Sequence, residues 1–148
     1  MGRLIGSSNS NNYGEKLFIE KSIEYLDDTY IIYWNRQVFG KEFDVCILMP
    51  DKGILVVELK GWKESNIDRV DNNDKIVVNT EDGPIFANPM KQARGYRFAI
   101  ERRIRQSISK FPLVFSMVCF PQVSKSFYAK KYFKYRKNVT LASDEDKA

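Results

Sequence analysis

The sequence predicts an α/β domain in which a mixed β-sheet is flanked by helices. Short apolar runs rich in β-branched residues, typical of buried strands, alternate with segments whose apolar residues recur at helical spacing. These segments follow one another as helix, paired strands, helix and strand, an order typical of a sheet layered by helices. With 148 residues, of which 43% are hydrophobic, the chain is long enough for one domain with a substantial core.

Two apolar runs, 43–49 and 54–60, predict a β-hairpin at the centre of this sheet. The loop between them contains proline, aspartate, lysine and glycine. If Gly53 is the left-handed residue of a three-residue loop, then Asp44 faces Lys60 across the hairpin.

Three charged residues of this hairpin, Asp44, Glu58 and Lys60, then share one face of the sheet. Asp44 and Glu58 become diagonal neighbours about 7 Å apart. Because burying an uncompensated polar or charged group costs several kcal/mol, either the three groups neutralise one another or a cation completes the site. Two carboxylates at this separation suit a hard cation such as Mg²⁺. The alternative is a buried ion cluster without chemistry.

A helix is predicted from residue 13 to about residue 26, with Asn11 or Asn12 as its cap. Glu15 falls on the inward apolar stripe of this helix. It either points towards the hairpin carboxylates or serves the helix dipole or cap. Residues 1–12, rich in glycine, serine and asparagine, are predicted to form a loose arm.

The rest of the chain supplies the flanking elements. We expect a strand at 30–34 that turns at 35–36 towards 37–39, and a polar excursion at 67–86 whose best short strand is 75–79. A long helix is expected from a cap at Asn88 to about residue 109, followed by a buried strand at 113–120.

Composition narrows the function. The net charge of +5 favours polyanionic partners. Cys46 and Cys119 both lie in apolar runs, which predicts buried thiols and favours a reducing, cytoplasmic location. No segment is long and apolar enough to span a membrane. Histidine is absent, which excludes histidine-dependent triads and most zinc sites.

Four short motifs occur in the order seen in a known family. They are Gly14-Glu15, Glu42-Phe43-Asp44, Glu58-Leu59-Lys60-Gly61-Trp62 and Asn88-Pro89-Met90-Lys91-Gln92-Ala93. Together they resemble the NERD (nuclease-related) domain of the PD-(D/E)XK nuclease superfamily. The resemblance implies a restriction-endonuclease-like core, which we assign to residues 13–121. Residues 122–148 form a basic, aromatic segment that could lead to a further domain.

The resemblance also implies roles for individual residues. Asp44 and Glu58 would be metal ligands, with Glu15 as a helical acid at the same metal, and Lys60 would be the catalytic lysine. Gln92 would join them, because Gln92 and Tyr96 resemble the Gln-x-x-x-Tyr motif of RecB-type nucleases. The expected cofactor is Mg²⁺ or Mn²⁺, and the expected reaction is hydrolysis of DNA phosphodiester bonds.

Several residues around these motifs are candidates for DNA binding: Trp62, Lys63, Lys91, Arg94, Tyr96 and Arg97. The alternatives are a packing tryptophan, a packing tyrosine and a solvated basic helix face. The interleaved basic and aromatic residues of the C-terminal segment either bind single-stranded nucleic acid or pack on the sheet.

Two functions therefore follow from the sequence. The first is a Mg²⁺-dependent deoxyribonuclease. The second is a catalytically silent module of the same fold that binds nucleic acid or recruits a partner. The resemblance implies a helicase-like protein as one setting for such a module, since many NERD domains are fused to helicase or kinase domains.

Overall fold

The computed structural model describes residues 1–6, 12–38, 41–71, 75–107, 112–131 and 139–141. Its centre is a six-stranded mixed sheet with the strand order β1-β2-β3-β4-β8-β9. The strands of this sheet are β1 (Arg3–Ile5), β2 (Ile31–Val38), β3 (Lys41–Met49), β4 (Gly53–Leu59), β8 (Val114–Phe120) and β9 (Val139–Leu141). The predicted α/β class is confirmed, and the arrangement is consistent with a restriction-endonuclease-like core.

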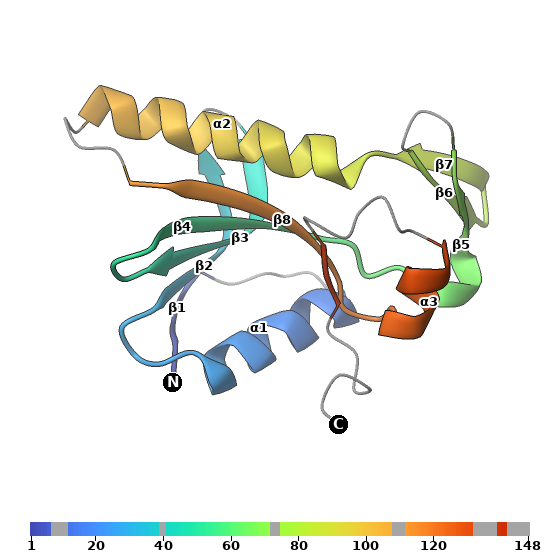
Figure 1. Ribbon diagram of the computed structural model, residues 1–148, viewed down its shortest axis with the longest axis horizontal. Coiled ribbons are helices and arrows are strands. Elements are labelled where there is room, and N and C mark those ends of the chain that lie inside the picture. The colour runs from blue at the N-terminus through green and yellow to red at the C-terminus, as the bar shows by residue number, and fades with distance from the viewer. Residues whose placement is uncertain (7–11, 39–40, 72–74, 108–111, 132–138, 142–148) are drawn as a thin grey trace.

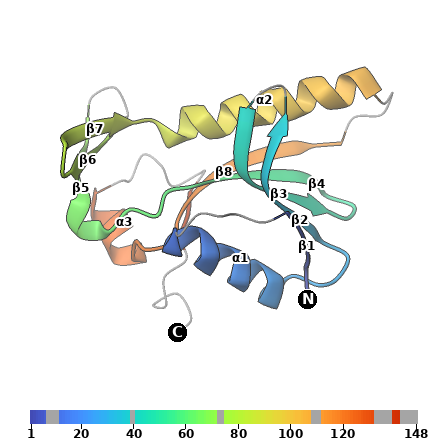
Figure 2. The same ribbon diagram turned by 180° about the vertical axis from the view of Figure 1, so that it is seen from behind.

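The two long helices cover opposite faces of the sheet (Figures 1 and 2). α1 (Tyr13–Tyr25) begins at the Asn12 cap, and α2 (Pro89–Ser107) begins at Asn88, whose Oδ1 accepts a hydrogen bond from the Lys91 N–H. Alternation along β4 divides the core: Val57 packs on the α1 side, and Val56 packs on the α2 side with Ile100. Glu58 therefore faces α2.

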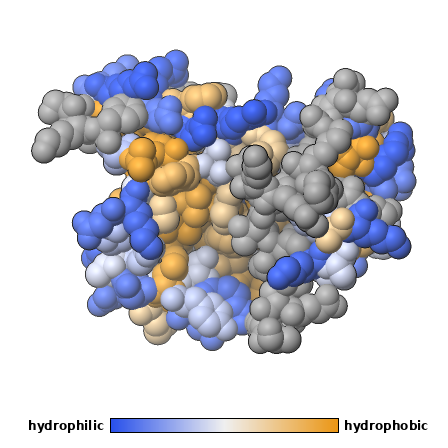
Figure 3. Space-filling view, viewed as in Figure 1, coloured by the Kyte–Doolittle hydropathy of each residue, from blue (hydrophilic) through white to orange (hydrophobic). Residues whose placement is uncertain are grey.

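α2 carries most of its charge outward. In Figure 3 hydrophilic residues line the edge of the molecule over α2, and an apolar area lies below it, over the region of β4 and β8. Its inner stripe includes buried Ala93 and Ile100 and half-buried Tyr96. The predicted helical periodicity is confirmed as far as Ser107, and residues 108 and 109 lie outside the described residues.

The register of the β3–β4 hairpin differs from the predicted one by two residues. Met49 pairs with Gly53 and Val45 pairs with Val57, so continuing the ladder places Asp44 opposite Glu58 rather than Lys60. The reason lies in the loop, where Asp51, with φ of 60°, is the left-handed residue. A shift of two residues preserves the parity of a strand, so Asp44 and Glu58 remain on the same side.

Gly53 is not the left-handed loop residue that the sequence predicts, but it is needed for a close backbone contact. Its φ is 130°, and a Cβ atom there would lie 2.1 Å from the Leu113 carbonyl oxygen. That same carbonyl accepts a hydrogen bond of 2.8 Å from the Ile54 N–H. The glycine therefore allows β4 to approach the segment that leads into β8.

Two predictions for the N-terminal half are wrong. Residues 3–5 form β1, which pairs in parallel with β2, instead of belonging to a loose arm. β2 continues past residues 35 and 36 instead of turning there, because its ladder with β3 goes on with Arg36 paired to Phe43 and Gln37 paired to Glu42. Asn35 lies inside the strand with a left-handed φ of 51°. Asparagine tolerates that conformation better than most residues.

The expected polar excursion at 67–86 forms a second sheet, and some of its residues are buried in the hydrophobic core. Its three antiparallel strands are β5 (Ile67–Val70), β6 (Ile76–Thr80) and β7 (Gly83–Ala87), preceded by the short 3-10 helix η1 (Glu64–Asn66). Ile76 and Val78 pack against Val118 of the main sheet and against Tyr128 of α3 (Lys125–Lys131). The aromatic residues Phe127 and Tyr128 thus pack in the core, as the packing interpretation predicts.

Both cysteines are buried and free, and burial raises the pKa of each thiol to about 12. Within the described part of the chain, no helix is long and apolar enough to cross a membrane.

Candidate active site

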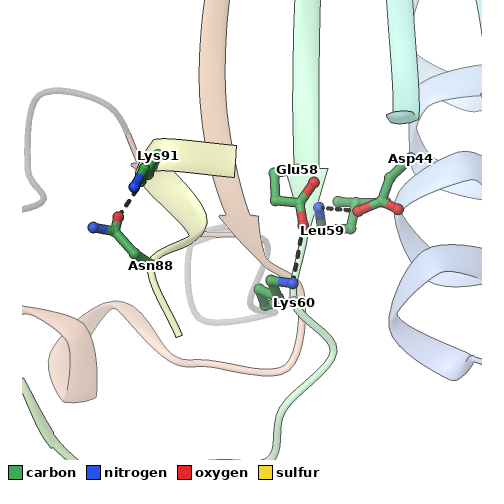
Figure 4. A network of polar contacts seen from close by, with 6 residues as sticks. All are labelled: Asp44, Glu58, Leu59, Lys60, Asn88 and Lys91. Atoms are coloured by element: carbon green, nitrogen blue, oxygen red, sulfur yellow. Dashed lines mark hydrogen bonds and ion pairs between the residues drawn. The ribbon is translucent and has the colours of Figure 1, made fainter. Parts of the chain in front are cut away.

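The structure brings Asp44, Glu58 and Lys60 together at the end of the β3–β4 hairpin (Figure 4). The Lys60 Nζ lies 2.9 Å from the Glu58 Oε1. The Asp44 Oδ2 accepts a hydrogen bond of 2.8 Å from the N–H of Leu59, the residue between Glu58 and Lys60. A backbone donor and a side-chain ammonium therefore orient the two carboxylates.

The Glu58 carboxylate is the most constrained group of the cluster. Only 3% of the residue is exposed, and its Oε2 is buried without a hydrogen bond from any described donor. The pKa of Glu58 is raised to about 7, first by burial and then by the neighbouring Asp44 carboxylate, whereas Lys60 opposes the shift. Lys60 alone thus does not compensate the two carboxylates, so their ionised form calls for a second cation or a proton.

This electrostatic arrangement predicts how stability depends on pH. The pKa of Glu58 rises from 4.5 to about 7 on folding, so the folded state binds the proton more tightly than the unfolded state. Without metal, the free energy of unfolding should therefore fall as the pH rises from about 4.5 to about 7, by up to roughly 3 kcal/mol. Urea denaturation in EDTA at pH 5 and pH 8 measures the difference. In Glu58→Gln this contribution should disappear, and an unchanged pH dependence in that variant would contradict the assignment.

Glu15 lies in the first turn of α1, the helix that covers the sheet face opposite to α2 (Figure 1). Its Oε2 accepts a hydrogen bond of 3.4 Å from the Trp34 indole, and its N–H donates to the Asn12 Oδ1 at 3.2 Å. Within the described residues, no three acidic, cysteine or histidine side chains form a group that could hold a metal. The structure thus pairs Asp44 with Glu58 but does not assemble the predicted three-carboxylate set with Glu15.

A groove of about 1320 Å³ opens beside the cluster, between the hairpin end, β7 and α2. Asp44 and Lys60 belong to its lining, while the buried Glu58 stands behind them. Five further residues predicted for catalysis or DNA binding line it: Trp62, and Lys91, Gln92, Arg94 and Tyr96 of α2. Figure 4 shows the first turn of α2, with Asn88 and Lys91, across from Lys60.

Trp62 packs against the core, as the packing interpretation predicts, and it also belongs to the groove lining. Its ring packs against the core at 6.0 Å from the Phe120 ring, and the Lys60 Nζ lies 5.7 Å from its centroid. A tryptophan at that distance attracts the ammonium through its π-face. It thereby helps to place Lys60 at the groove wall.

Two predicted DNA-binding residues lie elsewhere. Lys63 is exposed just before η1, and Arg97 lies 3.8 Å from Glu101 and stacks over the Phe98 ring. Neither belongs to the described lining of the groove. Their predicted role in DNA binding therefore receives no support from this groove.

A tight backbone junction fixes the segment that follows Lys60. A Cβ atom on Gly61 would lie 2.6 Å from the Asn12 Oδ1, and one on Gly14 would lie 2.9 Å from the Gly61 Cα. The Gln122 Nε2 donates a hydrogen bond of 2.8 Å to the Gly61 carbonyl. These contacts join the start of α1 to the end of β4, next to Glu15 and Lys60. Sequence reasoning missed Gln122, because its partner lies 61 positions earlier and no local pattern marks it.

Comparison with known protein families identifies one match. The model of the nuclease-related domain (NERD) family matches residues 10–121, about three quarters of the chain. No curated protein and no solved structure matches the chain. The match includes α1, the β3–β4 hairpin and α2, which surround the candidate active site. The chain therefore belongs to the nuclease-related domain family.

Proposed function

We propose that this protein is a metal-dependent nuclease that hydrolyses DNA phosphodiester bonds at the Asp44–Glu58–Lys60 cluster. One observation carries the proposal: the buried Glu58 Oε2 has no described donor, and it adjoins the Asp44 carboxylate. The Asp44 and Glu58 carboxylates supply the oxygen ligands that Mg²⁺ or Mn²⁺ prefers, and Lys60 lies with Asp44 in the groove lining.

The residues of the chain divide the work. Asp44 and Glu58 would hold the ion, which when bound supplies charge relief on the phosphate and an acidified water. Lys60 lies at the groove wall and would donate to the water or to a phosphate oxygen on which negative charge develops. Gln92 lines the groove and would orient the phosphate. The Glu15 carboxylate is held by the Trp34 indole in the first turn of α1 and is not grouped with the other two carboxylates, so we assign the ion to Asp44 and Glu58 alone.

A second candidate function rests on another observation. Since no group of three metal-binding side chains occurs among the described residues, a catalytically silent module that binds nucleic acid or recruits a partner, such as a helicase, also fits. In that case the Glu58–Lys60 pair would be a structural ion pair of the fold.

Cleavage assays separate the two functions. The purified chain should nick supercoiled plasmid or degrade a labelled single strand in Mg²⁺ or Mn²⁺, and EDTA should stop the reaction. DNA binding without cleavage in either metal would favour the silent module.

DNA binding should depend steeply on salt. Lys60, Lys91 and Arg94 line the groove, and three phosphate contacts predict that log K falls with log salt at a slope of about −2.7 on duplex DNA. Affinity should therefore fall roughly 40-fold between 50 and 200 mM salt. Fluorescence anisotropy measures this slope, and a flat response would contradict phosphate binding by these cations.

A further inference from the structure

The groove carries exposed aromatic side chains that the hydrolytic cluster does not use. Phe86 of β7 and Phe98 of α2 are each 54% exposed, and both line the groove. Neighbouring Ile85, 43% exposed, extends the apolar wall. Large apolar side chains gathered at a groove commonly mark a binding surface.

Two cations share the helix face that carries Phe98. Along α2, Phe98 follows Arg94 by four residues and Lys91 by seven, so the three lie on one exposed stripe of the helix. All three line the groove that leads to Asp44 and Lys60. The α2 side of the groove thus presents two positive charges and one aromatic ring over two helical turns.

This combination matches one class of ligand. Phosphates require cations, and only unpaired bases offer free faces to an aromatic ring, because the bases of a duplex are stacked on their neighbours. A purely apolar peptide would leave the cations of the groove without partners, whereas a duplex would not engage the rings.

We propose that the groove binds single-stranded DNA, with bases stacked on Phe86 and Phe98 and phosphates on Lys91 and Arg94. The strand is thereby led to Asp44 and Lys60. The inference rests on the proposed function, since it names the form of DNA that this nuclease would take.

The test measures binding in EDTA, where no cleavage occurs. Fluorescence anisotropy compares three ligands of equal length: a single strand, a blunt duplex and a single strand of abasic sites. Phe86→Ala and Phe98→Ala should each weaken binding of the single strand about 5- to 100-fold, as expected for the loss of one stacked base. Binding of the duplex and of the abasic strand should change less than twofold.

Two control variants separate loss of the aromatic ring from misfolding and from loss of apolar side-chain volume. Phe115→Ala removes an exposed phenylalanine of β8 that lies outside the groove lining, and it should leave binding of all three ligands unchanged. Phe98→Leu keeps apolar volume without the ring and should behave like Phe98→Ala. Full single-strand affinity in Phe98→Leu, or equal losses for the intact and abasic strands, would overturn the proposal.

The two proposals fail separately. A chain that binds single strands through these rings but cleaves no DNA in Mg²⁺ or Mn²⁺ would disprove the nuclease function alone. A chain that cleaves DNA with no dependence on Phe86 or Phe98 would disprove the stacking groove alone.

Discussion

Replacing Asp44 with asparagine is expected to abolish Mg²⁺-dependent cleavage of DNA. The affinity of the variant protein for DNA should stay equal to that of the parent or rise slightly. The substitution removes one negative charge from the carboxylate pair on which cation affinity depends. Loss of the ion costs several kcal/mol of transition-state stabilisation, or at least about a 10³-fold drop in rate. DNA affinity should survive because the lost charge repels phosphate. A plasmid-cleavage assay and an anisotropy titration measure the two quantities.

The same variant also distinguishes a catalytic site from a structural ion cluster. The asparagine side-chain oxygen can still accept the hydrogen bond from the Leu59 N–H, and the repulsion with Glu58 disappears. The melting temperature without metal should therefore stay the same or rise. A structural cluster predicts the opposite, a loss of about 3–5 kcal/mol. Asp28→Asn, at an exposed residue after α1, is the matched control and should alter neither cleavage nor stability.

Replacing Lys60 with methionine should lower the cleavage rate at least about 10²-fold, as removal of one donor from a developing oxyanion does. Methionine keeps much of the apolar stem that packs beside Trp62 but removes the ammonium 2.9 Å from Glu58. Initial rates at saturating Mg²⁺ measure the effect. Lys60→Arg should restore little activity, because the planar guanidinium cannot place a single donor as the ammonium does.

The stability of the Lys60→Met variant should depend on pH. Lys60 opposes the upward shift in the pKa of Glu58, so its loss raises that pKa further. The variant should therefore lose stability at pH 8 and change little at pH 5, where Glu58 is protonated in both proteins. Lys52→Met, in the exposed hairpin turn, is the control. Cleavage within threefold of the parent in Lys60→Met would remove this lysine from the proposed mechanism.

The sequence predicts the candidate site better than it predicts the register that builds it. The parity of Asp44 and Glu58 depends only on an even or odd offset, so it survives the two-residue error in the hairpin. The predicted register assumes Gly53 as the left-handed residue of the loop, whereas Asp51 adopts that conformation. A glycine in a loop therefore does not show that the left-handed residue is the glycine, because a neighbouring aspartate can adopt that conformation instead.

The parts that the sequence does not predict depend on contacts between distant segments. β1 gains its hydrogen bonds from β2, about 28 positions away, and a three-residue strand has no periodicity of its own. The sequence predicts only one strand of the second sheet, because β5 and β7 alternate weakly. β5 buries Ile67 in the cluster with Val118, and β7 is held by its pairing with β6. The groove rings had a local signal: Phe98 lies on the basic stripe of α2 at helical spacing.

The most direct test is a calorimetric titration of the metal-free chain with Mg²⁺ or Mn²⁺ at pH 8. The proposed function predicts saturable binding of the ion at the Asp44–Glu58 pair, and its loss in Glu58→Gln. Glu20→Gln, at an exposed residue of α1, should bind as the parent does. Failure of the parent to bind either ion, or unchanged binding in Glu58→Gln, would contradict the proposed metal site.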